Sequence, residues 1–163
     1  SLDIDACVAK WKSWEETEKE ILRIFDGKPG FIDRALTETK NKYVDKEGLR
    51  RELTAFKAAW PELKERIRKQ IIPFEEVRRR LKLVGAPYEP EQLGVSRARF
   101  RDTFAKIPYM RSRFSNIDIA YRCGFMDEWL ERLFGKGGVW EVGSPAPGSG
   151  EPARSAAAPV PGA

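Results

Sequence analysis

The chain has 163 residues and a formal net charge of +5, with 41% hydrophobic and 34% charged residues. That length is typical of a single domain, and this much charge suits amphipathic helices with solvated outer faces. The sequence has no histidine, which excludes Ser-His-Asp and Cys-His catalysis and every metal site that needs imidazole.

The first helices are indicated by capping signals. We predict a short helix within residues 2–11. Ser13 and Glu16 then show the pattern of a capping box, in which each side chain bonds the other residue's backbone N–H. Gly27 and Pro29 end this second helix, because glycine favours the left-handed conformation and proline cannot continue a helix.

Two further helices are predicted over residues 31–43 and 46–60, where apolar residues recur every three or four positions. Pro61 either breaks the second of these or begins a new helix as its first residue. Residues 73–84 show the clearest helical pattern, and Gly85 can supply the left-handed residue after its last turn.

The second half of the chain is also predicted to be helical. Pro87 and Pro90 favour an extended connector, and Ser96 can cap the following helix, which Pro108 interrupts. The last two helices are expected at residues 114–122 and 127–134.

No segment alternates as a β-strand does, and no apolar run is long enough to span a membrane, so we predict an all-α chain. Residues 1–140 are expected to form one helical domain, which can lack elements at its N-terminal side. Residues 141–163 are rich in proline, alanine and glycine. We expect this tail to be disordered because it cannot bury enough apolar surface.

Cys7 and Cys123 are the only cysteines. Two are too few for a disulfide framework or for a four-thiolate zinc site. We therefore expect buried, reduced thiols in a cytoplasmic protein.

Positive charge is concentrated in residues 64–113, which hold 14 lysines and arginines against 6 acidic residues. Such a block can bind phosphate groups on nucleic acid or on a small metabolite. The alternative is a set of solvated helix faces, because Arg78, Arg79 and Arg80 point in three directions around a helix. No zinc finger, aromatic sheet motif or convincing helix-turn-helix accompanies the charge, so nucleic acid is not the expected partner.

Arg111 and Arg113 precede the helix expected near Phe114, where positive charge opposes the helix dipole. One interpretation is that the two guanidinium groups bind a phosphate or a carboxylate. The other is a salt bridge to Asp118 or to a neighbouring helix. We identify no catalytic, cofactor-binding or metal-binding residue in the sequence.

Three stretches in the second half of the chain resemble a known family. They are GAP followed by a proline turn and LGVS (85–96), RSRF (111–114) and IDIAYRCGFMDE (117–128). Their order is similar to that in the C-terminal helical region of bacterial-type sn-glycerol-1-phosphate dehydrogenases. Upstream, WEETEKEILRIF and KNKYVDKEGLRRELTAFKAAWPELKERI are similar to that family's middle helices. The resemblance covers residues 10–140.

The family belongs to the superfamily of iron-containing alcohol dehydrogenases and dehydroquinate synthase-like enzymes. The resemblance implies a two-domain enzyme, with an N-terminal nucleotide-binding α/β domain, a C-terminal helical bundle and an active site in the cleft between them. The implied reaction is hydride transfer between NAD(P)H and dihydroxyacetone phosphate, which gives sn-glycerol 1-phosphate for phospholipid biosynthesis. A divalent metal, zinc or nickel, would polarise the substrate oxygen. In the family an aspartate and two histidines upstream of the matched region hold this metal.

The sequence departs from the full family pattern, because it lacks the Gly-rich cofactor loop and the histidines. We therefore expect a C-terminal domain or fragment that is inactive alone and binds no cofactor by itself. Its expected partner is the N-terminal nucleotide-binding domain. The chain could also form a homo-oligomer. Arg111 and Arg113 are the candidates for contact with the substrate phosphate. The alternative function is a non-enzymatic basic helical module that binds nucleic acid or an acidic protein partner.

Overall fold

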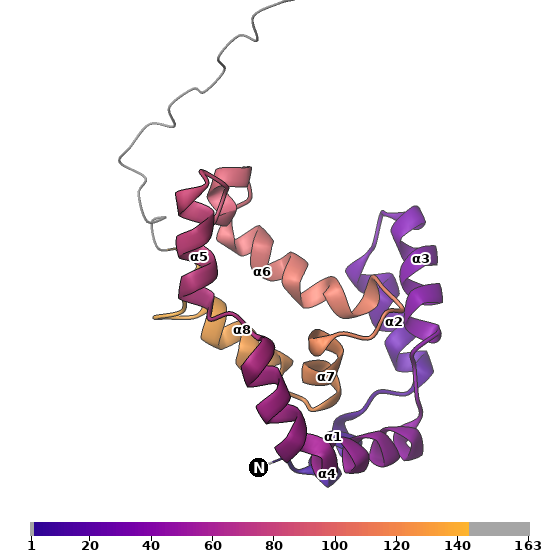
Figure 1. Cartoon of the computed structure of the whole chain (residues 1–163). Coiled ribbons are helices and arrows are strands. Elements are labelled where there is room, and N and C mark those ends of the chain that lie inside the picture. Colours follow the sequence, from indigo (N-terminus) through magenta and orange to yellow (C-terminus); the bar gives the residue numbers. More distant parts are fainter. Residues whose placement is uncertain (1, 144–163) are drawn as a thin grey trace, which may run out of the picture.

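The computed structural model describes residues 2–143, which form eight α-helices, two short 3₁₀-helices and no strand (Figure 1). The all-α prediction is confirmed. The α-helices are α1 (Ile4–Lys10), α2 (Trp14–Ile24), α3 (Pro29–Lys40), α4 (Lys46–Gln70), α5 (Phe74–Leu83), α6 (Arg97–Lys106), α7 (Asn116–Arg122) and α8 (Met126–Phe134). The 3₁₀-helices are η1 (Pro90–Leu93) and η2 (Ile107–Tyr109). Beyond residue 143, the tail that we expect to be disordered lies outside the described residues.

The capping signals in the sequence set the helix boundaries. The Ser13 hydroxyl accepts a hydrogen bond from the Glu16 amide at 3.2 Å, and the Glu16 carboxylate accepts one from the Ser13 amide at 2.7 Å. The predicted capping box is therefore confirmed. Ser96 caps α6 by accepting from the Arg99 amide at 3.2 Å. After α5 and α7 the chain reverses through Gly85 and Gly124, whose φ angles are +68° and +71°.

The prediction that Pro61 breaks or restarts a helix is wrong, because α4 continues through it. Proline has no N–H to donate to the carbonyl four residues earlier, so one backbone hydrogen bond is lost and a kink is expected. Figure 1 shows that α4 changes direction part-way along its length. The residues after Pro61 are mainly Glu, Leu, Lys and Arg, which favour helix strongly enough to continue it.

The core consists of three clusters, each joining helices that are distant in sequence. The first joins α1 to α4 and to the end of α7, the second joins α2, α3 and η2, and the third joins α7 to α8 with α6 packed against it. Their buried members are Val8, Leu49, Leu53 and Cys123; Ile21, Phe25, Ala35 and Tyr109; and Ala120, Met126, Leu130 and Phe134. Burial of these aliphatic and aromatic side chains gives the main stabilisation of the fold.

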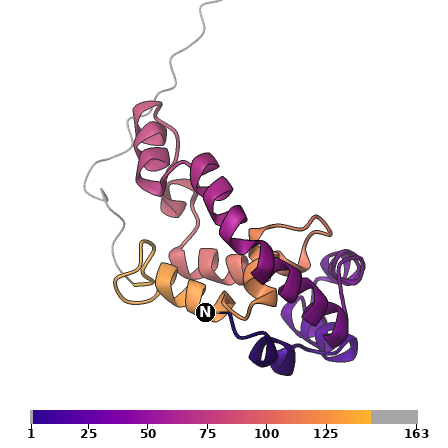
Figure 2. The ribbon, with the colours of Figure 1, turned by 60° about the horizontal axis from the view of Figure 1, so that its bottom comes forward.

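The second half of α4 and all of α5 lie at the periphery, and no residue of α5 is buried. Figure 2 shows α4 crossing the molecule diagonally toward α5. Among the contacts that hold α5, Arg78 forms an ion pair with Glu89, and Phe74 packs edge-on against Trp140 at 5.8 Å between ring centroids. Within the described residues, no helix is both long enough and apolar enough to cross a membrane.

Candidate functional site

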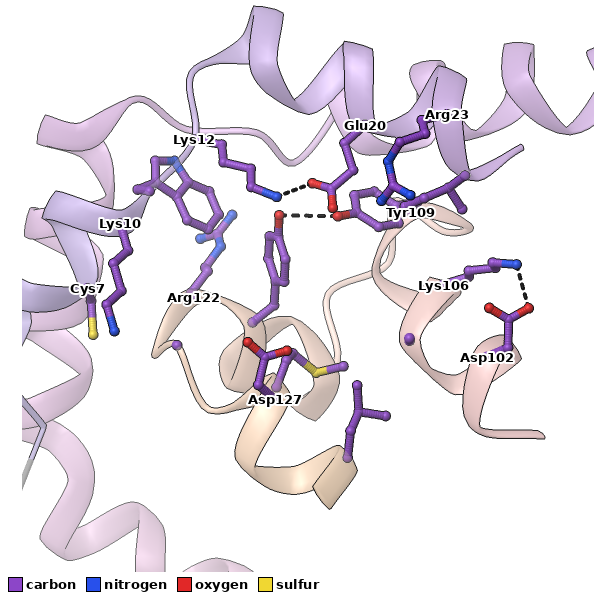
Figure 3. Close-up of a pocket in the computed structure, with 17 residues that line it drawn as sticks. Cys7, Lys10, Lys12, Glu20, Arg23, Asp102, Lys106, Tyr109, Arg122 and Asp127 are labelled. Atoms are coloured by element: carbon purple, nitrogen blue, oxygen red, sulfur yellow. Dashed lines mark hydrogen bonds and ion pairs between the residues drawn. The ribbon is translucent and has the colours of Figure 1, made fainter. Parts of the chain in front are cut away.

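A cleft of about 540 Å³ opens between the α1–α2 segment and the α6–α8 segment (Figure 3). Its walls carry five basic and three acidic side chains, so the lining is polar with an excess of positive charge. These charged residues are Lys10, Lys12, Arg23, Lys106, Arg122, Glu20, Asp102 and Asp127. We treat the cleft as the candidate site because acidic, basic and tyrosine side chains meet in its lining.

Two tyrosines meet inside the cleft. The hydroxyl oxygens of Tyr109 and Tyr121 are 3.3 Å apart and share one hydrogen bond. Tyr109 belongs to the α2–α3 core, whereas Tyr121 stands on α7 with the Trp11 ring edge-on at 5.4 Å. Burial raises the pKa of both phenols. Both therefore stay protonated near neutral pH and can donate hydrogen bonds, but neither is a general base.

Ion pairs set the charge that the cleft presents. Lys12 pairs with Glu20 at the top of Figure 3, and Lys106 pairs with Asp102 at 2.6 Å. Arg122 forms structural contacts within the protein: it pairs with Glu52 and donates a hydrogen bond to the Lys42 carbonyl at 2.5 Å. The cleft therefore offers hydrogen-bond donors and partly neutralised cations, which suits binding of a polar molecule better than proton transfer.

The cysteines lie next to each other near one edge of the cleft. The Cys7 thiol donates a hydrogen bond to the Cys123 carbonyl at 3.2 Å. Burial raises the pKa of both thiols, that of Cys123 to about 11. Cys123 is buried and Cys7 is partly exposed, and both are free thiols. Because the thiolate is the nucleophile, neither cysteine is activated for covalent catalysis near neutral pH.

Within residues 2–143, no group of three or more His, Cys, Asp or Glu side chains is placed to hold a metal ion. The residues present do not fit the metal that the resemblance implies. We therefore assign no metal ligand to this chain and derive no chemical step through a metal.

The structure exposes both candidate arginines. Arg111 and Arg113 lie on the segment between η2 and α7, and neither forms an ion pair within the described residues. The alternative interpretation, a salt bridge from this pair to Asp118 or to a neighbouring helix, is not formed within residues 2–143. Asp118 pairs instead with Lys42, and its carboxylate also accepts from the Ser115 amide at 2.8 Å and the Ser115 hydroxyl at 2.9 Å. This second capping box starts α7 at Asn116, two residues later than predicted.

Neither arginine lines the cleft, so the structure does not bring the candidate pair and the cleft residues into one site. A hydrogen bond from the Ser112 amide to the Glu38 carboxylate, 2.6 Å long, ties the arginine segment to α3. The phenyl ring of Phe114 lies under the Arg122 guanidinium, 4.8 Å from ring centroid to carbon. The backbone of the segment is thus held while the two guanidinium groups face solvent.

The basic block is partly neutralised by carboxylates within the same chain. Arg79 and Arg80 share the Glu76 carboxylate, which lowers the pKa of Glu76 to about 2. The other paired cations of the block are Arg66, Arg68, Arg78, Arg97 and Lys106. Half of its 14 basic residues therefore have an acidic partner within the chain, which favours the interpretation as solvated helix faces.

The sequence did not indicate the cleft residues. Lys12 and Glu20 lie about 100 positions before Tyr109 and Tyr121, and no local spacing connects them. A pairing of this kind becomes visible only when the helices are packed. Comparisons with protein-family models, with curated proteins and with solved structures found no match to this chain.

Proposed function

We propose that the chain is the C-terminal helical part of an NAD(P)-dependent sn-glycerol-1-phosphate dehydrogenase, and that Arg111 and Arg113 bind the substrate phosphate. The observation that carries the proposal is the ordered set of motifs in the second half of the chain. In this fold the three motifs form the connector from α5 to α6, the segment before α7, and the stretch from α7 into α8.

The first motif, residues 85–96, builds the connector from α5 to α6. Gly85 and Gly94 have positive φ angles of +68° and +69°, and Ser96 caps α6. Positive φ favours glycine because a Cβ atom there crowds the backbone carbonyl of its own peptide unit. The last motif, residues 117–128, supplies Asp118 to the capping box of α7 and Gly124 to the turn before α8.

The middle motif, residues 111–114, carries the proposed contact with the substrate. Asp118 is occupied by Lys42 and Ser115, so the fold does not use the charges of Arg111 and Arg113. A guanidinium group can bind a phosphate through two parallel N–H donors. Two solvent-facing arginines on a tethered segment suit a substrate that enters from outside this helical part.

The chemical step itself would come from groups outside these residues. In the family that the sequence resembles, NAD(P)H supplies the hydride and a divalent metal polarises the substrate oxygen. This chain's residues would hold the phosphate and cover one side of the substrate. We accordingly expect no dehydrogenase activity from the 163 residues alone.

The second candidate, a module that binds nucleic acid, is less well supported. Affinity for nucleic acid grows with the number of phosphates that lysine and arginine neutralise. In residues 64–113 half of those cations already have a carboxylate partner within the chain. Salt-sensitive binding of a DNA duplex to the purified chain would revive this candidate.

Steady-state kinetics of the complete polypeptide that contains these residues can test the arginine assignment. Arg111→Ala and Arg113→Ala should each raise KM for dihydroxyacetone phosphate about 10-fold, because each removes a charge-assisted hydrogen bond. Dihydroxyacetone, which lacks the phosphate, is the matched control substrate, and its KM should not change. An unchanged KM for dihydroxyacetone phosphate in both variants would contradict the proposal that these arginines bind the substrate phosphate.

A further inference from the structure

The two cysteines come from opposite ends of the described chain and meet in the same core cluster. Cys7 stands on α1, and Cys123 is the residue directly after α7. The Cys7 sulfur is 3.2 Å from the Cys123 carbonyl oxygen, although the two residues are 116 positions apart. Cys123 belongs to the cluster of Val8, Leu49 and Leu53, and Cys7 packs against that cluster.

We propose that Cys7 and Cys123 form a site of thiol oxidation, at which a small disulfide such as glutathione disulfide converts the pair into an intramolecular disulfide. The proposal does not depend on the dehydrogenase assignment. Two cysteines can be bridged only when their backbones lie within a few ångströms of each other. The hydrogen bond from the Cys7 thiol to the Cys123 carbonyl places the Cys7 sulfur beside the backbone of Cys123.

Access determines which thiol reacts first. Cys7 is partly exposed and lines the cleft of Figure 3, whereas Cys123 is 3% exposed. A small disulfide in the cleft can therefore reach Cys7 but not Cys123. Cys7 is the attacking residue, and Cys123 resolves the product from within the protein.

The exchange balances in two steps. The Cys7 thiolate attacks one sulfur of glutathione disulfide, so that a mixed disulfide forms and one glutathione thiolate leaves. The Cys123 thiolate then attacks the Cys7 sulfur, and the second glutathione thiolate leaves. Two electrons pass from the protein to glutathione, and the two thiol protons end on the two glutathione molecules.

The helix that carries Cys7 can adjust to the geometry of a disulfide. Helix α1 has only seven residues, and a helix of that length is not stable without packing. It is held by burial of Val8 and by a hydrogen bond from the Trp11 indole to the Val44 carbonyl at 2.8 Å. Because α1 depends on these contacts rather than on its own length, it can shift toward the geometry of a disulfide, and the Trp11–Tyr121 ring contact would move with it.

The reaction should be slow near neutral pH and faster in alkaline solution. Burial raises the pKa of both thiols, so the reactive thiolate is scarce at pH 7. The site thus differs from an activated redox centre. It responds to strong or sustained oxidation rather than to a brief change.

The test treats the full chain with glutathione disulfide at pH 8.5 and follows the product by intact mass and by digestion without reductant. Wild type should lose two hydrogens, and its digest should contain one peptide that links Cys7 to Cys123. Cys123→Ser should stop at the mixed disulfide, gaining one glutathione on Cys7. Cys7→Ser should stay unmodified while folded and react only in denaturant.

Two outcomes would overturn the proposal. One is a wild-type chain that keeps glutathione on Cys7 without forming the internal link. The other is a wild-type chain that remains reduced under the same treatment. A measurement on wild type alone gives an independent check, because the oxidised chain should have a higher thermal midpoint than the same sample after reduction. An equal or lower midpoint would contradict a disulfide that links α1 to the end of α7.

Discussion

Lys42 and Asp118 form an ion pair that joins the segment after α3 to the first turn of α7, across 76 positions of sequence. Both side chains are largely buried, with exposures of 12% and 7%. Lys42 thus pairs with the Asp118 carboxylate, which the sequence analysis considered as a partner for Arg111 or Arg113. The proposed role of those arginines depends on this pairing, because it leaves their charges free.

Removing the lysine should destabilise the fold strongly. Lys42→Met leaves the Asp118 carboxylate buried without its cation, and we expect a loss of about 3 kcal/mol in the free energy of unfolding. Urea denaturation followed by circular dichroism measures this change. Arg51→Met is the matched control, because the Arg51–Glu47 pair is exposed and its loss should cost no more than about 0.5 kcal/mol. Equal effects of the two substitutions would contradict the buried role of Lys42.

A second buried ion network should hold the connector between α5 and α6. The Glu89 side chain is 3% exposed, pairs with Arg78 and lies 3.9 Å from the Arg97 guanidinium. Glu89→Gln leaves Arg78 without its carboxylate partner, whereas Arg97 keeps its ion pair with Glu91 at 2.8 Å, so we expect a loss of about 3 kcal/mol in the free energy of unfolding. Glu62→Gln, at an exposed pair, should change stability by about 0.5 kcal/mol at most. A small effect of Glu89→Gln in urea denaturation would show that solvent reaches this network.

The turn between α7 and α8 should require glycine for its backbone conformation alone. Gly124 has a φ of +71°, and a Cβ atom added there would meet nothing within 4 Å. Gly124→Ala should therefore cost about 1–2 kcal/mol through backbone strain rather than through a clash. Gly30→Ala is the control, because Gly30 lies in α3 with open space around it, and alanine there should be neutral or stabilising by up to about 1 kcal/mol. Thermal unfolding of both variants decides between these outcomes.

The buried thiol of Cys123 should make stability fall in alkaline solution. Its pKa in the folded chain is raised from 9.0 to about 11 by burial, so the folded state holds this proton more tightly than the unfolded state does. Its contribution is fully present below about pH 9 and is lost as the pH rises toward 11, by about 2 kcal/mol. Comparing wild type with Cys123→Ala isolates the effect, because the variant lacks this titration. A difference in unfolding free energy that stays constant from pH 8 to pH 11 would exclude it.

Local chemistry made much of the fold predictable from the sequence. Ser13 with Glu16, and Gly85 with Gly124, act within a few residues of their own position, so their patterns identify helix ends directly. Pro61 was misjudged because its effect depends on the strong helix formers that follow it. The local pattern alone did not show that α4 continues through Pro61 despite the loss of one backbone hydrogen bond.

The candidate site was much less predictable. Arg111 and Arg113 were identified from charge and position, but the partner of Asp118 was not, because Lys42 reaches Asp118 only after α3 and α7 both pack against η2. The Tyr109–Tyr121 contact in the cleft likewise depends on how η2 meets α7. Contacts of this kind are set by tertiary packing, which sequence spacing does not encode.

The most direct test of the proposed function is the rate of NAD(P)H oxidation with dihydroxyacetone phosphate by the complete polypeptide that contains these 163 residues. With a divalent metal present, we predict that the complete polypeptide forms sn-glycerol 1-phosphate, that the 163 residues alone do not, and that Arg111→Ala with Arg113→Ala weakens use of the phosphorylated substrate. A complete polypeptide that folds, binds neither nicotinamide cofactor and leaves dihydroxyacetone phosphate unchanged would contradict the assignment.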